Sequence, residues 1–167
     1  MMETSWRFFL LSREAEGMTS AHDAVQVAIH SQPFSATDQL DRWLQRAGSA
    51  AAATAVFMGH VRPETMDGAP LEALELSHYP GLCERLLLSF TQQQLSDHGV
   101  QSALVLHRVG RLSPGDLIVL VAVSGDRRGP VQRCCSDLLE LLKHEAPFWK
   151  REWSGGVGTW LGANTPL

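Results

Sequence analysis

The stretch SALVLHRVGRLSPGDLIVLVAVS, residues 102–124, contains the two most strand-like segments of the chain, separated by one short turn. The segments at 102–110 and 116–124 are rich in Val, Leu and Ile, and the turn between them carries Pro114 next to Gly115. Aliphatic runs joined by such a turn predict an antiparallel pair of strands. A tight hairpin among interleaved helices and strands favours an α+β fold over a purely parallel α/β sheet.

Further strands are expected on both sides of this hairpin. Upstream, β-prone or partly alternating segments lie at 27–34, 53–61 and 70–79, and the turn-rich stretch 62–69 predicts a polar loop. Downstream, a last short strand is expected at 157–161.

Three helices are expected between the strands. The first covers 35–48, where Ser35 and Asp38 form a capping box. The second runs from Pro80 to His98, and the third occupies 131–146 and ends before Pro147. The residues expected to face inward are Leu40, Trp43, Leu44 and Ala47 in the first, Leu82, Leu86 and Phe90 in the second, and Val131, Cys135, Leu138, Leu139 and Leu142 in the third.

Length and composition predict one domain, at 27–167, preceded by an N-terminal extension at 1–26. The chain has 167 residues, of which 44% are hydrophobic, enough for a real core. A formal net charge of -4 argues against general nucleic-acid binding, although a local cationic pocket for a small anion remains compatible with it.

Cysteine usage and the apolar runs predict a cytoplasmic protein. The three cysteines form no CxxC pair and are interpreted as reduced thiols, with neighbouring Cys134 and Cys135 as helix residues, one facing inward, rather than metal ligands. The RFFLL stretch at 7–11 is too short for a signal peptide, and no run has the length of a membrane span. We predict no metal and no cofactor.

The chain has only two lysines, Lys143 and Lys150, against twelve arginines. A lysine becomes a nucleophile or loses its proton when it is desolvated, whereas an arginine effectively does not. One interpretation is therefore that both amines serve one pocket. The other is a solvated basic helix end that interacts with the helix dipole.

Other cationic candidates stand at strand ends. Arg62 follows a buried-looking strand and suits a phosphate or carboxylate clamp, or else a structural salt bridge. Arg127 and Arg128 lie between a strand and a helix start, as anion ligands or as an exposed basic turn. His107 is a strand histidine with either a structural or a proton-transfer role. A set of cationic residues of this kind suits a site that binds an anionic substrate, with the reactive group supplied by another molecule.

These segments together resemble the large, catalytic subunit of molybdopterin synthase. The motifs, in family order, are QPFS (32–35), VFMGHVR (56–62), LELSHYPGL (74–82), HRVGRLSPGD (107–116), the strand LIVLVAVS followed by Asp126 and Arg127, and LLKHEAPFWKRE (141–152). The resemblance covers 27 to about 162.

The resemblance implies an α+β hammerhead-type fold, with a mixed or antiparallel sheet and flanking helices, and a sulfurtransferase activity. The family converts cyclic pyranopterin monophosphate to molybdopterin, using sulfur from the C-terminal thiocarboxylate of a ubiquitin-like small subunit. Two large subunits form the central homodimer of a heterotetramer. Neither nucleic acid nor membrane is an implied partner.

By position, the resemblance assigns Lys143 and Lys150 as catalytic residues. It assigns substrate binding to His60, Val61, Arg62, Asp126, Arg127, Arg151 and Glu152.

Departures from the family pattern leave a second hypothesis open. Asp126 stands where the family has histidine, Val131 replaces a phenylalanine, and Thr159 precedes Trp160 where an arginine is common. An acid beside an anionic substrate is unfavourable unless it is paired. The alternative function is therefore a catalytically weakened paralogue that binds or scaffolds a ubiquitin-like sulfur carrier.

Overall fold

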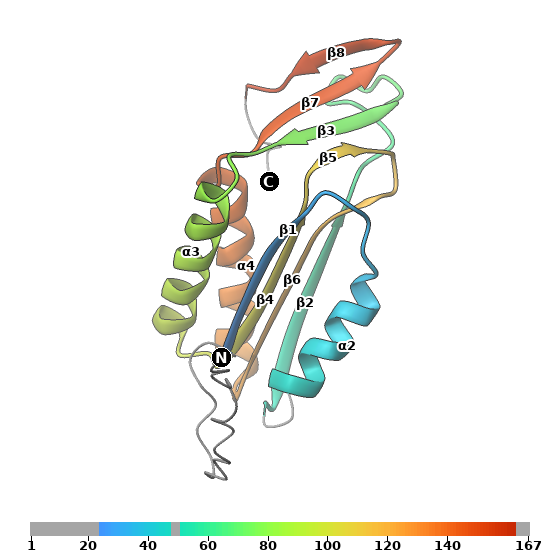
Figure 1. The fold of residues 1–167 in the computed structure, drawn as a ribbon. Helices are drawn as coiled ribbons and strands as arrows, with labels where there is room; N and C mark the ends of the chain where they lie inside the picture. The colour runs from blue at the N-terminus through green and yellow to red at the C-terminus, as the bar shows by residue number, and fades with distance from the viewer. Residues whose placement is uncertain (1–23, 48–50, 163–167) are drawn as a thin grey trace, which may run out of the picture.

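The computed structural model describes residues 24–47 and 51–162, so most of the predicted extension at 1–26 lies outside the described residues. Three helices and eight strands are described (Figure 1). In chain order they are β1 (Val25–His30), α2 (Ala36–Ala47), β2 (Ala53–His60), β3 (Ala73–Ser77), α3 (Leu82–His98), β4 (Ser102–Arg108), β5 (Gly110–Leu112), β6 (Leu117–Gly125), α4 (Arg128–His144), β7 (Trp149–Ser154) and β8 (Val157–Trp160).

The strands form two four-stranded sheets, which confirms the expected α+β class. The first sheet has the order β1-β4-β6-β2, with β1 parallel to β4 and the other pairs antiparallel. The second sheet has the order β5-β3-β7-β8 and is antiparallel throughout. The predicted pairing of 102–110 with 116–124 is confirmed as β4 with β6.

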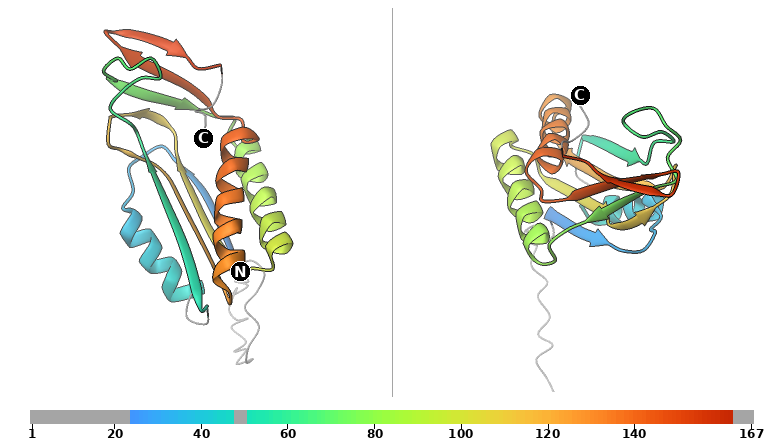
Figure 2. Two further views of the ribbon diagram at one scale, coloured as in Figure 1. Left: turned by 180° about the vertical axis from the view of Figure 1, so that it is seen from behind. Right: turned by 90° about the horizontal axis from the view of Figure 1, so that it is seen from above.

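Helices cover both faces of the first sheet. Figure 2 shows α3 and α4 side by side on one face and α2 on the other. Successive residues of a strand point to opposite faces. Val121 and Val123 of β6 accordingly pack with α4, whereas Leu120 and Ala122 pack with Trp43 of α2. Because both faces are buried, β4 is apolar without interruption over 103–106 and β6 over 117–123.

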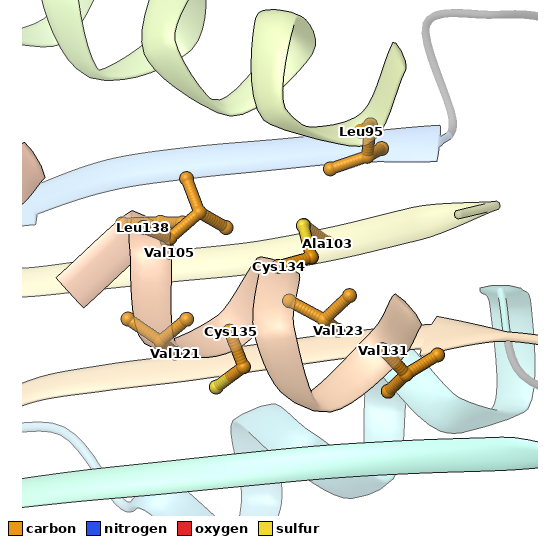
Figure 3. Close-up of a cluster of buried hydrophobic side chains, with 9 residues drawn as sticks. All are labelled: Leu95, Ala103, Val105, Val121, Val123, Val131, Cys134, Cys135 and Leu138. Atoms are coloured by element: carbon orange, nitrogen blue, oxygen red, sulfur yellow. The ribbon is translucent and has the colours of Figure 1, made fainter. Parts of the chain in front are cut away.

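The cluster under α4 fixes the position of that helix on the sheet (Figure 3). Val131, Cys134, Cys135 and Leu138 of α4 are all buried there. We had expected only one of the two cysteines to face inward. Both do, because residues three and four positions apart share one helix face, so Val131 and Leu138 draw Cys134 and Cys135 into the same apolar layer.

The second sheet begins where the chain leaves β4. Gly110 has a φ of 92°, a conformation suited to glycine, and β5 then pairs with β3 instead of forming a simple hairpin loop. The segment 111–116, which the sequence predicts as a simple turn, therefore also contains part of the strand β5. It carries the chain into the second sheet and back to β6.

Several sequence-based predictions of the elements differ from the structure. The first strand covers Val25–His30 and does not extend to Pro33. The second helix begins at Leu82, and its buried side is Cys83, Leu87, Thr91 and Leu95, one position beyond the predicted set. Leu82 is 40% exposed. The run LCERLLLSF puts apolar residues on several sides of the helix, so its periodicity does not define which side packs. The third helix covers Arg128–His144 instead of 131–146, and the strands β5 and β7 were not predicted.

The buried side of α3 provides a stability test with an adjacent control. Leu87→Ala removes a side chain with no exposed surface, so we expect a loss of about 2–5 kcal/mol in the free energy of unfolding. Leu88→Ala removes a side chain that is 39% exposed and should cost well under half as much. Urea denaturation measures both. Equal losses would contradict the assigned face.

Candidate active site

A cavity of about 460 Å³ lies where the second sheet meets the C-terminal end of α4 and the end of β2. It is lined by Phe57, Gly59, His60, Val61, Arg62, Leu71, Leu74, Leu76, His107, Ile118, Val119, Leu139, Glu140, Leu142, Lys143, Ala146, Phe148, Lys150, Glu152 and Leu161. Its walls are therefore largely apolar, with a small group of cations and acids among them.

Both lysines line this cavity, although they belong to different elements. Lys143 lies in the last turn of α4, and Lys150 lies on β7. The helix ends with the Glu145 N–H donating to the Leu141 carbonyl at 2.8 Å. The Phe148 N–H donates to the Ala146 carbonyl at 2.8 Å, which turns the chain into β7. The spacing of the two lysines allowed them to share one pocket, and the structure places both of them at this cavity.

The cavity makes Lys150 an unusual lysine. Burial lowers the pKa of its ammonium group, and the positive charges of Lys143 and Arg62 lower it further. A depressed pKa increases the fraction of neutral amine, which is the nucleophilic form. Because Lys143 and Arg62 line the same cavity as Lys150, an anionic ligand bound there would be attracted by several cationic side chains.

The residues after β2 form one wall. The Val61 N–H donates to the Asp116 carbonyl, and the Gly115 N–H donates to the Val61 carbonyl, both at 2.8 Å. Val61 is 4% exposed and packs among the leucines of the second sheet. This anchoring places His60 and Arg62 on either side of it at the cavity. All three predicted residues of this segment therefore line the cavity.

Strand alternation separates the two predicted residues that follow Lys150. Glu152 lines the cavity and is 8% exposed, and its carboxylate accepts a hydrogen bond from the Met66 N–H at 3.1 Å. This bond ties the loop after Arg62 to β7. Arg151 points to the opposite face of the second sheet, where it donates to Glu75 at 2.7 Å and lies over the rings of Trp153 and Trp160. Arg151 does not line the cavity.

Asp126 and Arg127 lie at the other end of α4. Arg127 is the residue that precedes the helix, and Asp126 accepts a hydrogen bond from the Gln101 side chain at 2.7 Å. Sixteen residues of helix separate Arg127 from Lys143, a rise of about 24 Å. Within one chain, these two predicted residues are therefore not part of the cavity.

His107 and Phe148 are the cavity residues whose relation the sequence did not predict. Their rings are stacked, with centroids 4.0 Å apart and planes 9° apart. The His107 Nδ1–H donates to the Arg108 carbonyl at 2.7 Å. Burial lowers the pKa of His107 to about 4, with further contributions from Lys150 and His78, so the ring is neutral at physiological pH. The signal in the sequence was the position of His107 at a strand end within HRVG.

Among the described residues, no group of three His, Cys, Asp or Glu side chains is arranged to hold a metal ion. None of the described helices is long and apolar enough to cross a membrane.

Comparison with protein families gives a match to the model of the MoaE protein over residues 29–145. A molybdopterin synthase catalytic subunit from Ralstonia nicotianae is 41% identical over 66% of this chain and 62% of that protein. The protein of the same name from Pasteurella multocida is 36% identical over 82% of this chain and 89% of its own length.

Solved structures give the same fold. A molybdopterin biosynthesis MoaE protein from Burkholderia ambifaria has a TM-score of 0.71 and 32% identity, covering 84% of this chain and 91% of that one. A chain from a complex of subunits 1 and 2 of the molybdopterin-converting factor of Helicobacter pylori has a TM-score of 0.69 at 21% identity, covering 81% and 90%.

The position of Arg151 gives a pH-dependent prediction about stability. Hydrogen bonds from Trp153 and Arg151 lower the pKa of Glu75 below its ordinary value of 4.5. The stabilisation is therefore present above pH 4.5 and is lost as the pH falls through the lower pKa of the folded state. We expect Glu75→Gln to cost about 1 kcal/mol at pH 7, after allowance for partial exposure, and much less near pH 3.

Urea denaturation of wild type and variant across this pH range measures the difference. Glu64→Gln, on the exposed loop after β2, is the matched control and should show no such trend. A Glu75→Gln deficit that stays constant with pH would contradict the assigned pairing.

Proposed function

The chain belongs to the MoaE protein family, and on that premise we propose that it is a sulfur-transferring catalytic subunit of molybdopterin synthase. The proposed reaction moves sulfur from the C-terminal thiocarboxylate of a ubiquitin-like small subunit to cyclic pyranopterin monophosphate. The observation that carries this proposal is the meeting of Lys143, Lys150 and Arg62 in one cavity. The two amines are the only lysines of the whole chain.

The chain's own thiols do not suit the role of sulfur donor. None of the three cysteines lines the cavity, and all three are buried. Burial raises the pKa of Cys134 to about 12 and that of Cys135 to about 11, so both remain protonated. The thiolate is the reactive form of cysteine. This arrangement supports a sulfur that is brought in by another molecule.

The cavity suits an anionic acyl group at its cationic end. In each transfer, the thiocarboxylate sulfur replaces an oxygen on a substrate carbon, so that a carbon–sulfur bond forms as a carbon–oxygen bond breaks and the oxygen leaves with a proton or with the phosphate. The bond between that sulfur and the acyl carbon then breaks on attack by water, which releases the small subunit as a carboxylate. Where a lysine amine attacks first, water hydrolyses the resulting amide to the same carboxylate. Lys150, with its lowered pKa, is suited to attack the acyl carbon, and Lys143 to stabilise the developing oxyanion.

Arg62 is proposed to hold the phosphate of the substrate. Its guanidinium belongs to the segment after β2 and lines the cavity with both lysines. Arginine binds phosphate with two parallel hydrogen bonds, whereas lysine acts as a point charge. Glu152 then has a supporting role, because its carboxylate is engaged with the Met66 N–H of the same loop.

The proposed partners are a small subunit and a second copy of this chain. The Helicobacter pylori structure is a complex of two different subunits, which supports the small-subunit partner. The free cysteines support a cytoplasmic location.

The second copy accounts for Asp126 and Arg127. The strand β2 is an edge of the first sheet, and its centre exposes Val56, Phe57 and Met58 by 40–46%. Exposed apolar edge strands favour pairing with another chain. In an antiparallel pair of β2 strands, the start of one copy's strand, where Ala53 pairs with Gly125, meets the end of the other's.

Such a pairing carries Arg127 of the second copy towards the cavity of the first. The eight residues of β2 span about 26 Å, close to the 24 Å between Arg127 and Lys143 along α4. Each complete site would then combine the lysines of one copy with Arg127 of the other.

Reconstitution tests the proposed reaction. Purified chain, thiocarboxylated small subunit and cyclic pyranopterin monophosphate should yield molybdopterin, detected as its fluorescent oxidation product. We expect Lys143→Ala and Lys150→Ala each to lower kcat at least 100-fold, because the first removes the charge that stabilises the oxyanion and the second removes the attacking amine. Arg151→Ala is the control and should keep KM for the pterin within about 2-fold. A wild-type chain that binds the small subunit but forms no product would support the scaffold alternative instead.

Co-expression of two inactive variants tests the shared site. Chains with Lys143→Ala and chains with Arg127→Ala, mixed equally, should recover about a quarter of wild-type activity, because half of the dimers contain one intact site of two. The pairing of Lys143→Ala with Lys150→Ala is the matched control and should recover nothing, since both lysines belong to one chain. Equal recovery in both mixtures, or none in either, would contradict the arrangement.

A further inference from the structure

The linker at residues 145–149, between the two lysines, is held in place at three successive residues. The contacts are Cys83 Sγ to the Pro147 carbonyl at 3.6 Å, His107 stacked on Phe148, and Trp149 with Tyr79 edge-on at 4.6 Å. Because this linker joins α4 to β7, its position sets where Lys150 lies relative to Lys143.

Only one of these contacts reaches the cavity. His107 and Phe148 both line it, whereas Trp149 is 41% exposed and lies outside it. A carbonyl oxygen only accepts hydrogen bonds, so the bond from His107 to the Arg108 carbonyl requires the proton on Nδ1. That bond fixes the ring plane, and the ring plane in turn fixes Phe148.

The neutral state of His107 suits this position. Several elements bring titratable or charged groups to the cavity that His107 lines or to His107 itself: Lys143 and Glu140 on α4, His60 and Arg62 at the end of β2, His78 after β3, and Lys150 and Glu152 on β7. An imidazolium here would add a further positive charge beside Lys150, whose own charge is already disfavoured by burial. A neutral aromatic ring supports Phe148 without that repulsion.

We propose that His107 is a positioning residue of the lysine site, because its hydrogen-bonded imidazole holds Phe148 and thereby fixes the Lys150 amine relative to Lys143. The proposal rests on the proposed function only in treating these amines as the reacting groups. A stack that served the core alone would affect the melting temperature but not the surroundings of Lys150.

The two-lysine composition makes this measurable without substrate or partner. Protein labelled with ¹³C and ¹⁵N only in lysine gives two sets of side-chain signals, which Lys143→Arg assigns. Titration of the full chain then gives the pKa of each amine separately. In the wild type, Lys150 should titrate below an ordinary lysine.

His107→Leu and Phe148→Leu remove the stack. We expect the Lys150 pKa to rise by about half a unit or more in both, as the loosened amine gains solvent. In the reconstituted reaction, kcat should fall about 10-fold or more while KM for the small subunit changes little, since misplaced groups lose rate rather than binding.

Two further variants separate the stack from general packing. His107→Phe keeps a neutral flat ring against Phe148 but loses the hydrogen bond to the Arg108 carbonyl, so it should raise the Lys150 pKa clearly less than His107→Leu does. Trp149→Leu removes the neighbouring aromatic contact outside the cavity and should leave the Lys150 pKa unchanged.

The proposal is overturned if the Lys150 pKa is unchanged in the folded Leu variants, or if His107→Phe shifts it as much as His107→Leu. Phe148→Leu supplies the comparison if His107→Leu does not fold, and a rise of the Lys150 pKa in Trp149→Leu as large as that in Phe148→Leu would also overturn the proposal. If the chain shows the expected pKa shifts but makes no molybdopterin, the proposed function is wrong. The role of His107 in positioning Lys150 would still stand.

Discussion

The pairing of β4 with β6 is the constraint on which the rest of the structure depends. These strands form the centre of the first sheet, and both of their faces are covered by helices. At one end the register is fixed by the buried hydrogen bond between the hydroxyls of Ser102 and Ser124, at 2.6 Å. At the other end β4 delivers His107 to the cavity and leads into β5. A shift of one residue in this register would exchange the two faces of a strand. It would therefore move both the apolar surface on which α4 packs and the stack of His107 on Phe148.

The sequence predicted those elements in which a single pattern was present. The aliphatic runs around Pro114 and Gly115 and the periodic apolar residues of α4 both led to the observed elements. The side of α3 that packs could not be read from a run containing leucine on several sides. The strand β7 escaped prediction because its polar and apolar residues are distributed in an unusual way. Its inward residues include Lys150 and Glu152 and its outward residues include Trp153, which inverts the usual distribution of polar and apolar side chains.

The candidate site shows a similar division. The rarity of lysine in the sequence identified Lys143 and Lys150. Neighbouring residues of a strand face opposite sides, so Lys150 faces the cavity whereas Arg151 pairs with Glu75 on the other face. The assignment of Asp126 came from the family resemblance alone, whereas Arg127 was also a candidate from its place before a helix, and one chain brings neither to the cavity. Local sequence contains no information about residues contributed by a second copy. The contact between His107 and Phe148 joins positions about forty residues apart, and no spacing rule predicts it.

The concentration of cations in the cavity links the energetics of the fold to the proposed chemistry. Lys143 and Arg62 lie near Lys150 in a partly buried site, and burial together with their positive charges lowers the pKa of Lys150. The fold maintains the arrangement because α4 is fixed by apolar packing and β7 by its pairing with β3 and β8. In the proposed function, an anionic thiocarboxylate or phosphate would offset these positive charges on binding. A neutral His107 is consistent with this balance, since it supports Lys150 without adding to the charge that a ligand must offset.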